Sequence, residues 1–420
     1  MMEKMKYVVI VGDGMADHPV EALGGKTPLM VAKTPHMDWM AKHGEMGLVK
    51  TVPEGFTAGS EIANLSIFGY DPVRYYTGRG PLEAASLNIQ LQPNDIAFRC
   101  NFVTLQTTGP RTIMEDFSAG HITSPEAEEI IPDLNRELGT HSIRFYVGVS
   151  YRHLMVWENG GAMFPDLAGL PLTPPHDIIG KEIGPFLPRN QISESEMSKM
   201  DGGNQVLDLM IRSQKLLRDH PVNRGRKSNG LLPANSIWLW GQGRSPRMVT
   251  LMERFGIGGY VISAVHLLKG IGMLAGLEVM DVPGATGYFD TNYEGKAAYA
   301  LEGLREKDLV YVHVEAPDEA GHMGDLRLKI ESIEAFDQKV VGAILKGMKD
   351  FKRYKVLVLP DHPTPLSVRT HVADPVPFVI YSSERPTGGD GAGPFDEMSA
   401  GRSGIFVEKG FELIDRFIEC

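Results

Sequence analysis

An apolar run that ends in an acid and a histidine constrains the fold of this chain more than any other stretch. The run extends from Leu309 to Val314, and after Ala316-Pro317 it delivers Asp318 and His322 in a glycine-containing turn. Near-continuous apolar runs of this length are typical of buried parallel strands, and open α/β sheets bind ligands at the carboxyl ends of their strands. The pair therefore lies where chemistry is expected, although a turn aspartate and a solvated histidine fit the same residues.

A second apolar run ends in the same two residue types. Residues 354–360 are followed directly by Asp361 and His362, and near the N-terminus the apolar residues 7–11 lead into the glycine-flanked Asp13. The segment GDGMAD lacks the third glycine of a dinucleotide-binding fingerprint, so Asp13 fits either a turn residue or a ligand. Acids that follow parallel strands of one sheet would lie at one edge of that sheet.

Strand-like and helix-like segments alternate at the N-terminus and again from Ser236 onward, with short turns between them. This alternation predicts an α/β fold with a doubly wound, mostly parallel sheet. We expect a long amphipathic helix over 326–348 and a mobile glycine-rich loop over 384–402. The strands expected after Ser236 are 237–240, 260–263, 277–281, 309–314, 354–359 and 376–381.

Ser60 follows a glycine and precedes a segment in which Ile62, Leu65 and Phe68 recur at helical spacing. The serine is therefore expected at a helix N-terminus, where it fits an N-cap or a nucleophile whose phosphate ester the helix amides would stabilise. The segment has no G-x-S-x-G motif and no nearby histidine base, so it does not indicate a hydrolase triad. A nucleophilic Ser60 would need another group, such as a metal ion, to lower the pKa of its hydroxyl.

The regular alternation of strand-like and helix-like segments is lost between residues 78 and 231. Strand-like runs at 96–103, 143–149 and 153–157 accompany a helix that opens at Ser124, and a Pro-rich and Gly-rich stretch leads into an amphipathic helix at 206–218. We interpret residues 78–231 as an inserted α+β cap domain that grips the substrate, and residues 1–77 and 232–420 as the metal-binding core.

The inserted segment carries basic and imidazole side chains in glycine-rich or turn contexts. Each fits an ordinary surface ion pair. Arginine also binds carboxylate and phosphate groups through paired hydrogen bonds, and an acidic protein that binds an anion must concentrate such residues locally. The residues concerned are Arg79, Arg99, His121, Arg152 and His153.

The net charge of -11 over 420 residues argues against nucleic acid or an anionic membrane as the main partner. Cys100 and Cys420 are too few for a disulfide framework, which favours a reducing compartment. No apolar stretch approaches the ~20 residues of a membrane span, and the run at 7–11 is too short for a signal-peptide core. We expect a soluble, cytoplasmic protein that acts on a small molecule, and the sequence does not indicate its oligomeric state.

The candidate residues form a set whose oxygen and nitrogen donors suit Mn²⁺, Zn²⁺ or Mg²⁺. Nearly all of them lie just past strand ends, which in one sheet point to one edge. Two metal ions roughly 4 Å apart can deprotonate a serine and clamp a transferring phosphoryl group. The set consists of Asp13, Ser60, Asp318, His322, Asp361, His362 and His371.

Motifs spread over almost the whole chain resemble those of the archaeal-type 2,3-bisphosphoglycerate-independent phosphoglycerate mutases, within the alkaline phosphatase superfamily. These motifs are GDGMAD, AGSEIANLSIFGYDP, TGRGPLEAAS, GATGYFDTNYEGKA, VHVEAPDEAGH, LPDH and HVADPVPF. The resemblance implies an alkaline phosphatase-like core with an inserted cap. It also implies the interconversion of 3-phosphoglycerate and 2-phosphoglycerate in glycolysis and gluconeogenesis, with no 2,3-bisphosphoglycerate as cofactor.

The resemblance further implies roles for individual residues. Ser60 would be the nucleophile that carries a phosphoserine intermediate at a site with two divalent ions, Mn²⁺ foremost, with Zn²⁺, Mg²⁺ or Co²⁺ as alternatives. One ion would be held by Asp13, Ser60, Asp361 and His362, and the other by Asp318, His322 and His371. The substrate would be bound by Arg79, His121, Arg152 and His153 of the cap and by Arg244, Arg247 and Lys269 of the core, with His121, Arg152 and Lys269 also acting in catalysis.

Four segments look closest to a bacterial branch that has been proposed to act as a homoserine kinase. They are PFVIY after HVADPV, LPDHPTP, SYRHLMVW and GQGRSP. A homoserine kinase of threonine synthesis is therefore the alternative activity, and a non-catalytic metal-binding protein is the alternative of another class. Intact ligand residues at all seven positions favour an enzyme, and we predict a metal-dependent phosphoglycerate mutase.

Overall fold

The computed structural model describes residues 4–188, 201–386 and 393–419, and the chain divides into two compact units. The first unit comprises residues 1–76 and 247–420, and the second comprises residues 77–246. The second unit is thus an insertion within the first. It ends after Pro246, however, and not at residue 231 as the sequence suggested.

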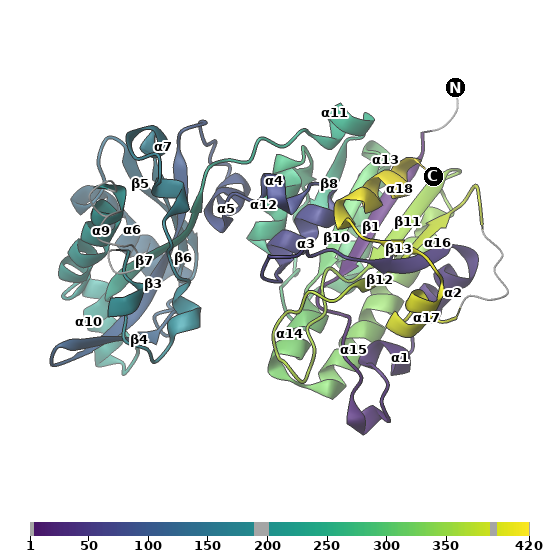
Figure 1. Cartoon of the computed structure of the whole chain (residues 1–420), viewed down its shortest axis with the longest axis horizontal. Coiled ribbons are helices and arrows are strands. Elements are labelled where there is room, and N and C mark those ends of the chain that lie inside the picture. The colour runs from purple at the N-terminus through teal and green to yellow at the C-terminus, as the bar shows by residue number, and fades with distance from the viewer. Residues whose placement is uncertain (1–3, 189–200, 387–392, 420) are drawn as a thin grey trace. The chain divides into compact units, whose positions relative to one another are not determined.

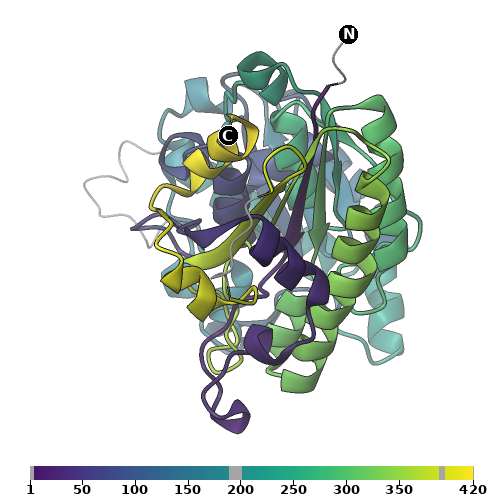
Figure 2. The ribbon, with the colours of Figure 1, turned by 90° about the vertical axis from the view of Figure 1, so that its right-hand side faces the viewer.

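A sheet of eight strands forms the centre of the first unit, in the order β13-β2-β12-β11-β1-β10-β8-β9. Among the described strands of this sheet, only β12 runs against its neighbours, so the predicted mostly parallel sheet is confirmed. Figure 2 shows the N-terminal strand β1, in dark purple, in the middle of the sheet. The strands are β1 (Lys6–Gly12), β2 (Glu45–Val49), β8 (Gly259–Ile262), β9 (Glu278–Val279), β10 (Leu309–Val314), β11 (Tyr354–Leu359), β12 (Val376–Ser382) and β13 (Phe406–Val407).

The three central strands end side by side. Strand β1 pairs in parallel with β10, where Gly12 lies opposite Val314, and with β11, where Val11 lies opposite Leu359. The residues that follow these three strands therefore emerge together at one edge of the sheet. This register is what brings acids separated by hundreds of residues in the sequence into one place.

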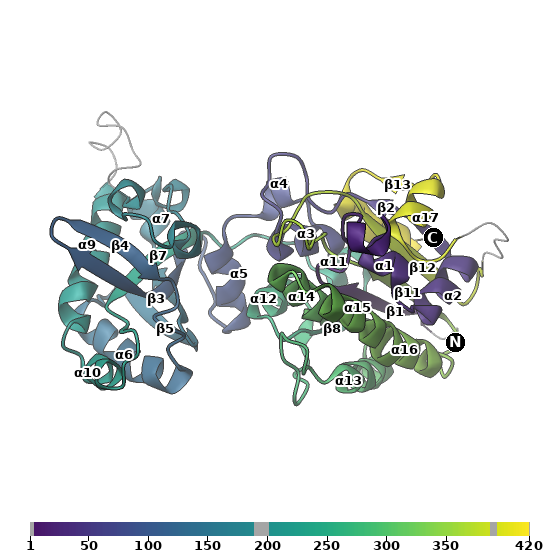
Figure 3. The same ribbon diagram turned by 90° about the horizontal axis from the view of Figure 1, so that it is seen from below.

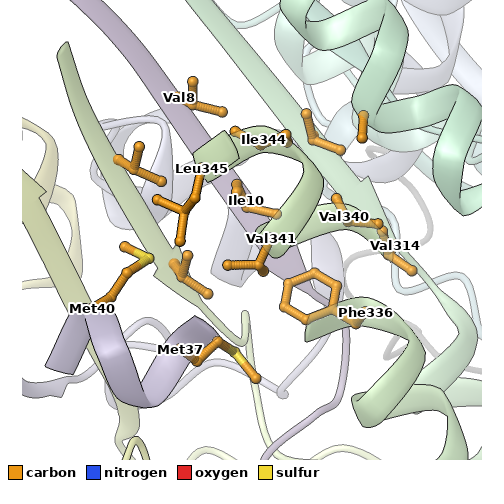
Figure 4. Packing of buried hydrophobic residues seen from close by; sticks show 14 of the residues in the cluster. Val8, Ile10, Met37, Met40, Val314, Phe336, Val340, Val341, Ile344 and Leu345 are labelled. Carbon is orange, nitrogen blue, oxygen red and sulfur yellow. The ribbon is translucent and has the colours of Figure 1, made fainter. Parts of the chain in front are cut away.

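Helices cover both faces of this sheet (Figure 1). On one face, α2 (Pro35–His43) and α13 (Tyr293–Glu306) pack with α15 (Leu326–Ala335) and α16 (Gly342–Met348), and Figure 3 shows α14, α15 and α16 following one another along the sheet. Figure 4 shows Met37 of α2, Ile344 of α16 and Phe336, which lies between α15 and α16, packed toward Val8 and Ile10 of β1. The other face is covered by α3 (Ser60–Ile67), α12 (His266–Leu274) and α18 (Leu413–Glu419).

The long helix predicted over 326–348 is present, but its middle is a π-helical segment, Phe336–Val341. In this segment the buried Asp337 accepts hydrogen bonds from the backbone amides of His36 (3.2 Å) and Met37 (2.8 Å) at the start of α2. Asp337 thus satisfies two N–H groups in the first turn of α2, since Thr34, the residue at the N-cap position, makes no side-chain capping bond. The loop expected over 384–402 is wrong in part, because α17 (Glu397–Arg402) is helical, and residues 387–392 lie outside the described chain.

The second unit is built on a five-stranded antiparallel sheet in which β3 pairs with β4, β6 and β7. Strand β7, expected in the core sheet, belongs here, because a buried strand shows the same apolar pattern in either sheet. Phe102, Ile130 and Trp238 contribute to the core between this sheet and its helices. The elements are β3 (Ile96–Thr108), β4 (Arg111–Asp116), β5 (Ile143–Val149), β6 (Arg152–Trp157), β7 (Ser236–Gly243), α5 (Arg79–Ser86), α6 (Ser124–Glu137), α9 (Asp201–Leu217) and α10 (Pro221–Ser228).

Among the described helices, none has both the length and the apolar character that a membrane-spanning segment requires.

Candidate metal centre

All seven of the expected ligand residues belong to the first unit, and their side chains meet at the carboxyl edge of its sheet. Asp13 follows β1, while Asp361 and His362 follow β11. The Nε2 atom of His362 lies 3.5 Å from Asp13 Oδ1 and 3.5 Å from Asp361 Oδ2. Both carboxylates and the imidazole are buried.

Asp318 and His322 do not lie in a turn, as the sequence suggested, but on a helix, α14 (Ala316–Met323), whose first turn contains Pro317. Proline is favoured in the first turn of a helix, because the N–H it lacks would have no intrahelical partner there. The two side chains are one helical turn apart, and His322 Nε2 lies 3.1 Å from Asp318 Oδ2.

His371 completes this second group from the loop between β11 and β12. Its Nε2 atom lies 3.5 Å from Asp318 Oδ1 and 3.0 Å from His322 Nε2. The ring centroids of His362 and His371 are 4.2 Å apart. His362 therefore connects the group around Asp13 and Asp361 with the group around Asp318. The ligand atoms of Asp318, His362 and His371 also lie within 4.8 Å of one another.

Ser60 is the first residue of α3, and Gly59 occupies the N-cap position. The Oγ atom of Ser60 lies 3.2 Å from His362 Nε2, within hydrogen-bond distance, and the α3 N-terminus has no side-chain capping bond. The N-cap interpretation of Ser60 is therefore wrong. The hydroxyl faces the cluster of acids and histidines from the N-terminus of a helix, an end that favours negative charge.

Asp361 is held in place by hydrogen bonds to both of its oxygens. Oδ1 accepts from the amides of Gly14 (3.1 Å) and His362 (2.9 Å), and Oδ2 accepts from Asn64 Nδ2 (2.9 Å). Asn64 also donates to the carbonyl of Ser60 (2.9 Å) and accepts from the hydroxyl of Tyr311. Asn64, which the sequence did not single out, thus links the backbone of Ser60 to a candidate ligand.

Gly14 allows the backbone to approach this closely. It adopts a φ of 59°, and a Cβ atom at this position would collide with Asp318 and Thr364. A glycine is therefore required at position 14, where the backbone passes close to Asp318.

The electrostatics of the cluster fit a site for divalent cations. Burial and the neighbouring carboxylates of Asp361 and Asp318 raise the pKa of Asp13 well above its ordinary value. Burial also opposes ionisation of Asp318, but hydrogen bonds with His322 and His371 hold its pKa well below the ordinary value. Asp13 Oδ1 is buried and makes no hydrogen bond with any described residue. Three buried carboxylates so close together need positive charge, and their oxygens and the imidazole nitrogens are donors for such ions.

Three further titratable residues behind the cluster were missed by the sequence analysis. His313, in β10, lies with its Nε2 atom 3.4 Å from Asp13 Oδ2. The Oε1 atom of Glu315 lies 3.3 Å from His313 Nδ1, and the Nζ atom of Lys296 lies 2.8 Å from Glu315 Oε2. One signal was available: Tyr311, His313 and Glu315 alternate along the segment that leads into the site.

In the second unit, two arginines, Arg79 and Arg99, lie beside Trp240. The guanidinium carbon of Arg99 is 4.6 Å from the Trp240 ring centroid, and that of Arg79 is 5.9 Å away. Burial, together with the charges of Arg79 and Arg152, lowers the pKa of Arg99 to about 10, although Glu83 opposes this shift. Arg152 is exposed. This part of the second unit therefore concentrates positive charge.

His121 is exposed at the end of a strained turn in the second unit. Ala119, Gly120 and His121 all adopt positive φ, at 52°, 59° and 51°, which is costly for the two residues that carry a side chain. The buried Arg226 donates hydrogen bonds to the carbonyls of Ala119 (2.7 Å) and Gly120 (3.2 Å). Arg226 thus stabilises the turn that presents His121.

The remaining expected substrate residues lie in different settings. His153 is buried against Phe102, and burial lowers its pKa to about 3. Arg244 belongs to the second unit and not to the core, and it donates to the carbonyl of Gly161. Arg247 is exposed in the first unit. Lys269 belongs to α12, which packs against α3, and its ammonium group pairs with Asp281.

Comparison with known proteins identifies the family. A family model described as 2,3-bisphosphoglycerate-independent phosphoglycerate mutase matches residues 41–223. A relative from Geobacter sulfurreducens, named as a probable 2,3-bisphosphoglycerate-independent phosphoglycerate mutase, is 51% identical over 99% of this chain and 100% of its own length. The chain belongs to the 2,3-bisphosphoglycerate-independent phosphoglycerate mutase family. The resemblance found in the motifs is therefore confirmed.

Other members of this phosphoglycerate mutase family are similarly close. One from Methanosarcina acetivorans is 50% identical over 99% of this chain and 100% of its own length, and one from Methanothrix thermoacetophila is 52% identical over 98% of each chain. Among solved structures, the cofactor-independent phosphoglycerate mutase of Thermoplasma acidophilum matches with a TM-score of 0.63, 27% identity and 99% coverage of each chain. A protein from Pyrococcus horikoshii matches with a TM-score of 0.79, 28% identity and coverage of 99% and 97%.

Proposed function

We propose that this chain is a metal-dependent phosphoglycerate mutase that interconverts 3-phosphoglycerate and 2-phosphoglycerate through a phosphoserine on Ser60, without 2,3-bisphosphoglycerate. The observation that carries the proposal is the place of Ser60, at a helix N-terminus with its hydroxyl against His362 and not in a capping bond. The substrate follows from membership of the family, whose similar relatives are named as mutases. Those names favour the mutase over the homoserine kinase.

Two divalent cations, Mn²⁺ foremost, fit the donors of the cluster. Asp13, Asp361 and His362 would hold one ion together with Ser60, and Asp318, His322 and His371 would hold the other. When bound, such ions neutralise the charge of a phosphoryl group and lower the pKa of a serine hydroxyl. The buried Asp13 oxygen that makes no hydrogen bond with any described residue supports this assignment.

The proposed reaction has two half-reactions that balance each other. In the first, Ser60 Oγ forms a bond to phosphorus while the bond between phosphorus and the C3 oxygen breaks, and the serine proton ends on that oxygen. In the second, the C2 oxygen bonds to phosphorus, the bond from phosphorus to Ser60 breaks, and the C2 hydroxyl proton returns to the serine. No water or nucleotide is consumed. Such transfers depend mainly on positioning and charge neutralisation.

The second unit would supply anion binding. Arg79 and Arg152 lie near Arg99 in its cluster of positive charge, and arginine matches the geometry of carboxylates and phosphates. Substrate binding by these residues, and roles for His121 and Lys269 in catalysis, are part of this proposal.

One pair of assays tests the activity. Interconversion of phosphoglycerates without nucleotide is expected, and phosphorylation of homoserine with ATP is not. The opposite result would contradict the mutase and establish the kinase. Ser60→Ala should lose all mutase turnover while the protein still binds metal, whereas Ser66→Ala, a buried serine on the same helix, should keep it. Substantial turnover by Ser60→Ala would rule out the covalent route.

Metal dependence has its own test. Chelation should abolish turnover and added Mn²⁺ should restore it, because three buried carboxylates are left without their counter-charge when the ions are removed. Turnover that is indifferent to the chelator would refute the metal assignment.

A further inference from the structure

His313 has no part in the proposed transfer, although it lies beside the cluster. It is the fifth residue of β10 (Leu309–Val314), and its side chain is 0% exposed. A buried polar ring costs free energy unless its nitrogens are paired, so its surroundings require an explanation.

One edge of the ring, with the Nε2 atom, points at two candidate ligands. His313 Nε2 lies 3.4 Å from Asp13 Oδ2 and 4.0 Å from Asp361 Oδ2. It makes no hydrogen bond with any residue that the structure describes. Ligand atoms of Asp13, His313 and Asp361 all lie within 4.8 Å of one another, which is close enough for one ion to contact all three.

The other edge of the ring faces a buried carboxylate. His313 Nδ1 lies 3.3 Å from Glu315 Oε1 without forming a hydrogen bond to it. That oxygen accepts hydrogen bonds from Ser263 Oγ and the Ala264 amide, both at 3.0 Å. Lys296 Nζ donates to Glu315 Oε2 and to the carbonyl of His313, both at 2.8 Å. A carboxylate behind a histidine is the arrangement that orients metal-binding imidazoles, because it holds the proton on the nitrogen away from the ion.

We propose that His313 is a further ligand, through Nε2, of the cation held by Asp13 and Asp361, and that Glu315 and Lys296 position its ring. This inference rests on the metal site of the proposed function but not on its substrate. The alternative is a protonated ring that pairs with the carboxylates of Asp13 and Asp361 in place of an ion.

Binding of Mn²⁺ to the full-length chain, measured by titration calorimetry without substrate, tests the proposal. Glu315→Gln should weaken one site by about 10–100-fold, the usual effect of losing the partner behind a ligand histidine. His313→Gln should weaken the same site by at least as much. His220→Gln, which removes a buried histidine paired with Asp133 in the second unit, should leave both sites unchanged. Unchanged Mn²⁺ affinity in His313→Gln, or tighter binding, would overturn the proposal.

A crystal structure of the Mn²⁺-loaded wild-type chain decides the question even if the His313 variant does not fold. An anomalous peak within about 2.3 Å of His313 Nε2 supports ligation, since nitrogen ligands of divalent metals lie near that distance. A peak between Asp13 and Asp361 that leaves Nε2 more than about 3 Å away would favour the protonated ring. Both measurements omit phosphoglycerate, so a failure of the proposed mutase activity would leave their outcome intact.

Discussion

Replacing Lys296 with methionine should destabilise the first unit by about 4 kcal/mol, because it leaves Glu315 buried without its counter-charge. Lys296 is 0% exposed and Glu315 is 3% exposed, and their charged atoms lie 2.8 Å apart. Removal of one partner from a buried ion pair costs about 3–5 kcal/mol, and the lost bond to the His313 carbonyl adds about 1 kcal/mol. Methionine fills a similar volume, so the loss of packing should be small. Glu315 can offset part of the cost by taking up a proton.

Urea unfolding followed by circular dichroism measures this loss, and hydrogen exchange in peptides from β10 assigns the transition to the first unit. The double variant Lys296→Met/Glu315→Leu should recover much of the loss, since it buries no unpaired charge. Lys339→Met removes a partly exposed pair with Glu294 on the same unit and should cost about 0–1 kcal/mol. The reasoning fails if Lys296→Met costs no more than Lys339→Met, or if the double variant is no more stable than Lys296→Met.

Three further predictions concern other parts of the molecule. Asn64→Leu should lower kcat and Mn²⁺ affinity together, because Asp361 and the backbone of Ser60 lose the hydrogen-bond donor that they share. Wild-type kcat and Mn²⁺ affinity would show that Asn64 contributes only to packing. Arg226→Met should lower kcat/KM and leave Mn²⁺ affinity unchanged, since it releases the turn that presents His121; wild-type kinetics would contradict a role for that turn. His153 has a folded-state pKa of about 3, below its ordinary value, so the unfolded chain binds more protons between about pH 6.5 and 3. The stability of the second unit should therefore fall as the pH drops through this range, by up to about 1.4 kcal/mol per pH unit, and His153→Leu should flatten the slope. Urea midpoints measured between about pH 6.5 and 3 give the pH dependence of stability. Equal slopes in the wild-type protein and in His153→Leu would refute the role of His153.

The sequence was most informative where an acid lies within a few residues of the end of a buried strand. Asp13, Asp318 and Asp361 could be found because the strands before them are continuous apolar runs, and such runs in a parallel sheet end at one edge. His313 was missed for the same reason, since it lies inside one of these runs and was read as part of the strand. The alternation of Tyr311, His313 and Glu315 places these side chains on one face of the strand, but it does not show that this face borders the site.

Other errors arose where tertiary contacts decide the local structure. The pattern of β7 fits a buried strand of either sheet, and only its pairing with β3 places it in the second unit. The first amides of α2 are bonded by Asp337, which lies about three hundred residues later in the chain on a π-helical segment, and not by the side chain of Thr34 at the N-cap position. Short-range propensities cannot show such partners, because the competing group is remote in sequence.

The central position of β1 has a consequence for how the chain acquires its structure. Tyr7 pairs with Leu309 of β10 and Lys355 of β11. The first strand to be synthesised therefore cannot pair with these strands until most of the chain has been made. The second unit, in contrast, is one continuous segment, residues 77–246. During synthesis the insertion can therefore fold first, while the apolar residues of β1 remain exposed to chaperones or to aggregation. The same register that gathers the acids at one edge means that the metal centre cannot be complete until Asp361, His362 and His371 have been synthesised.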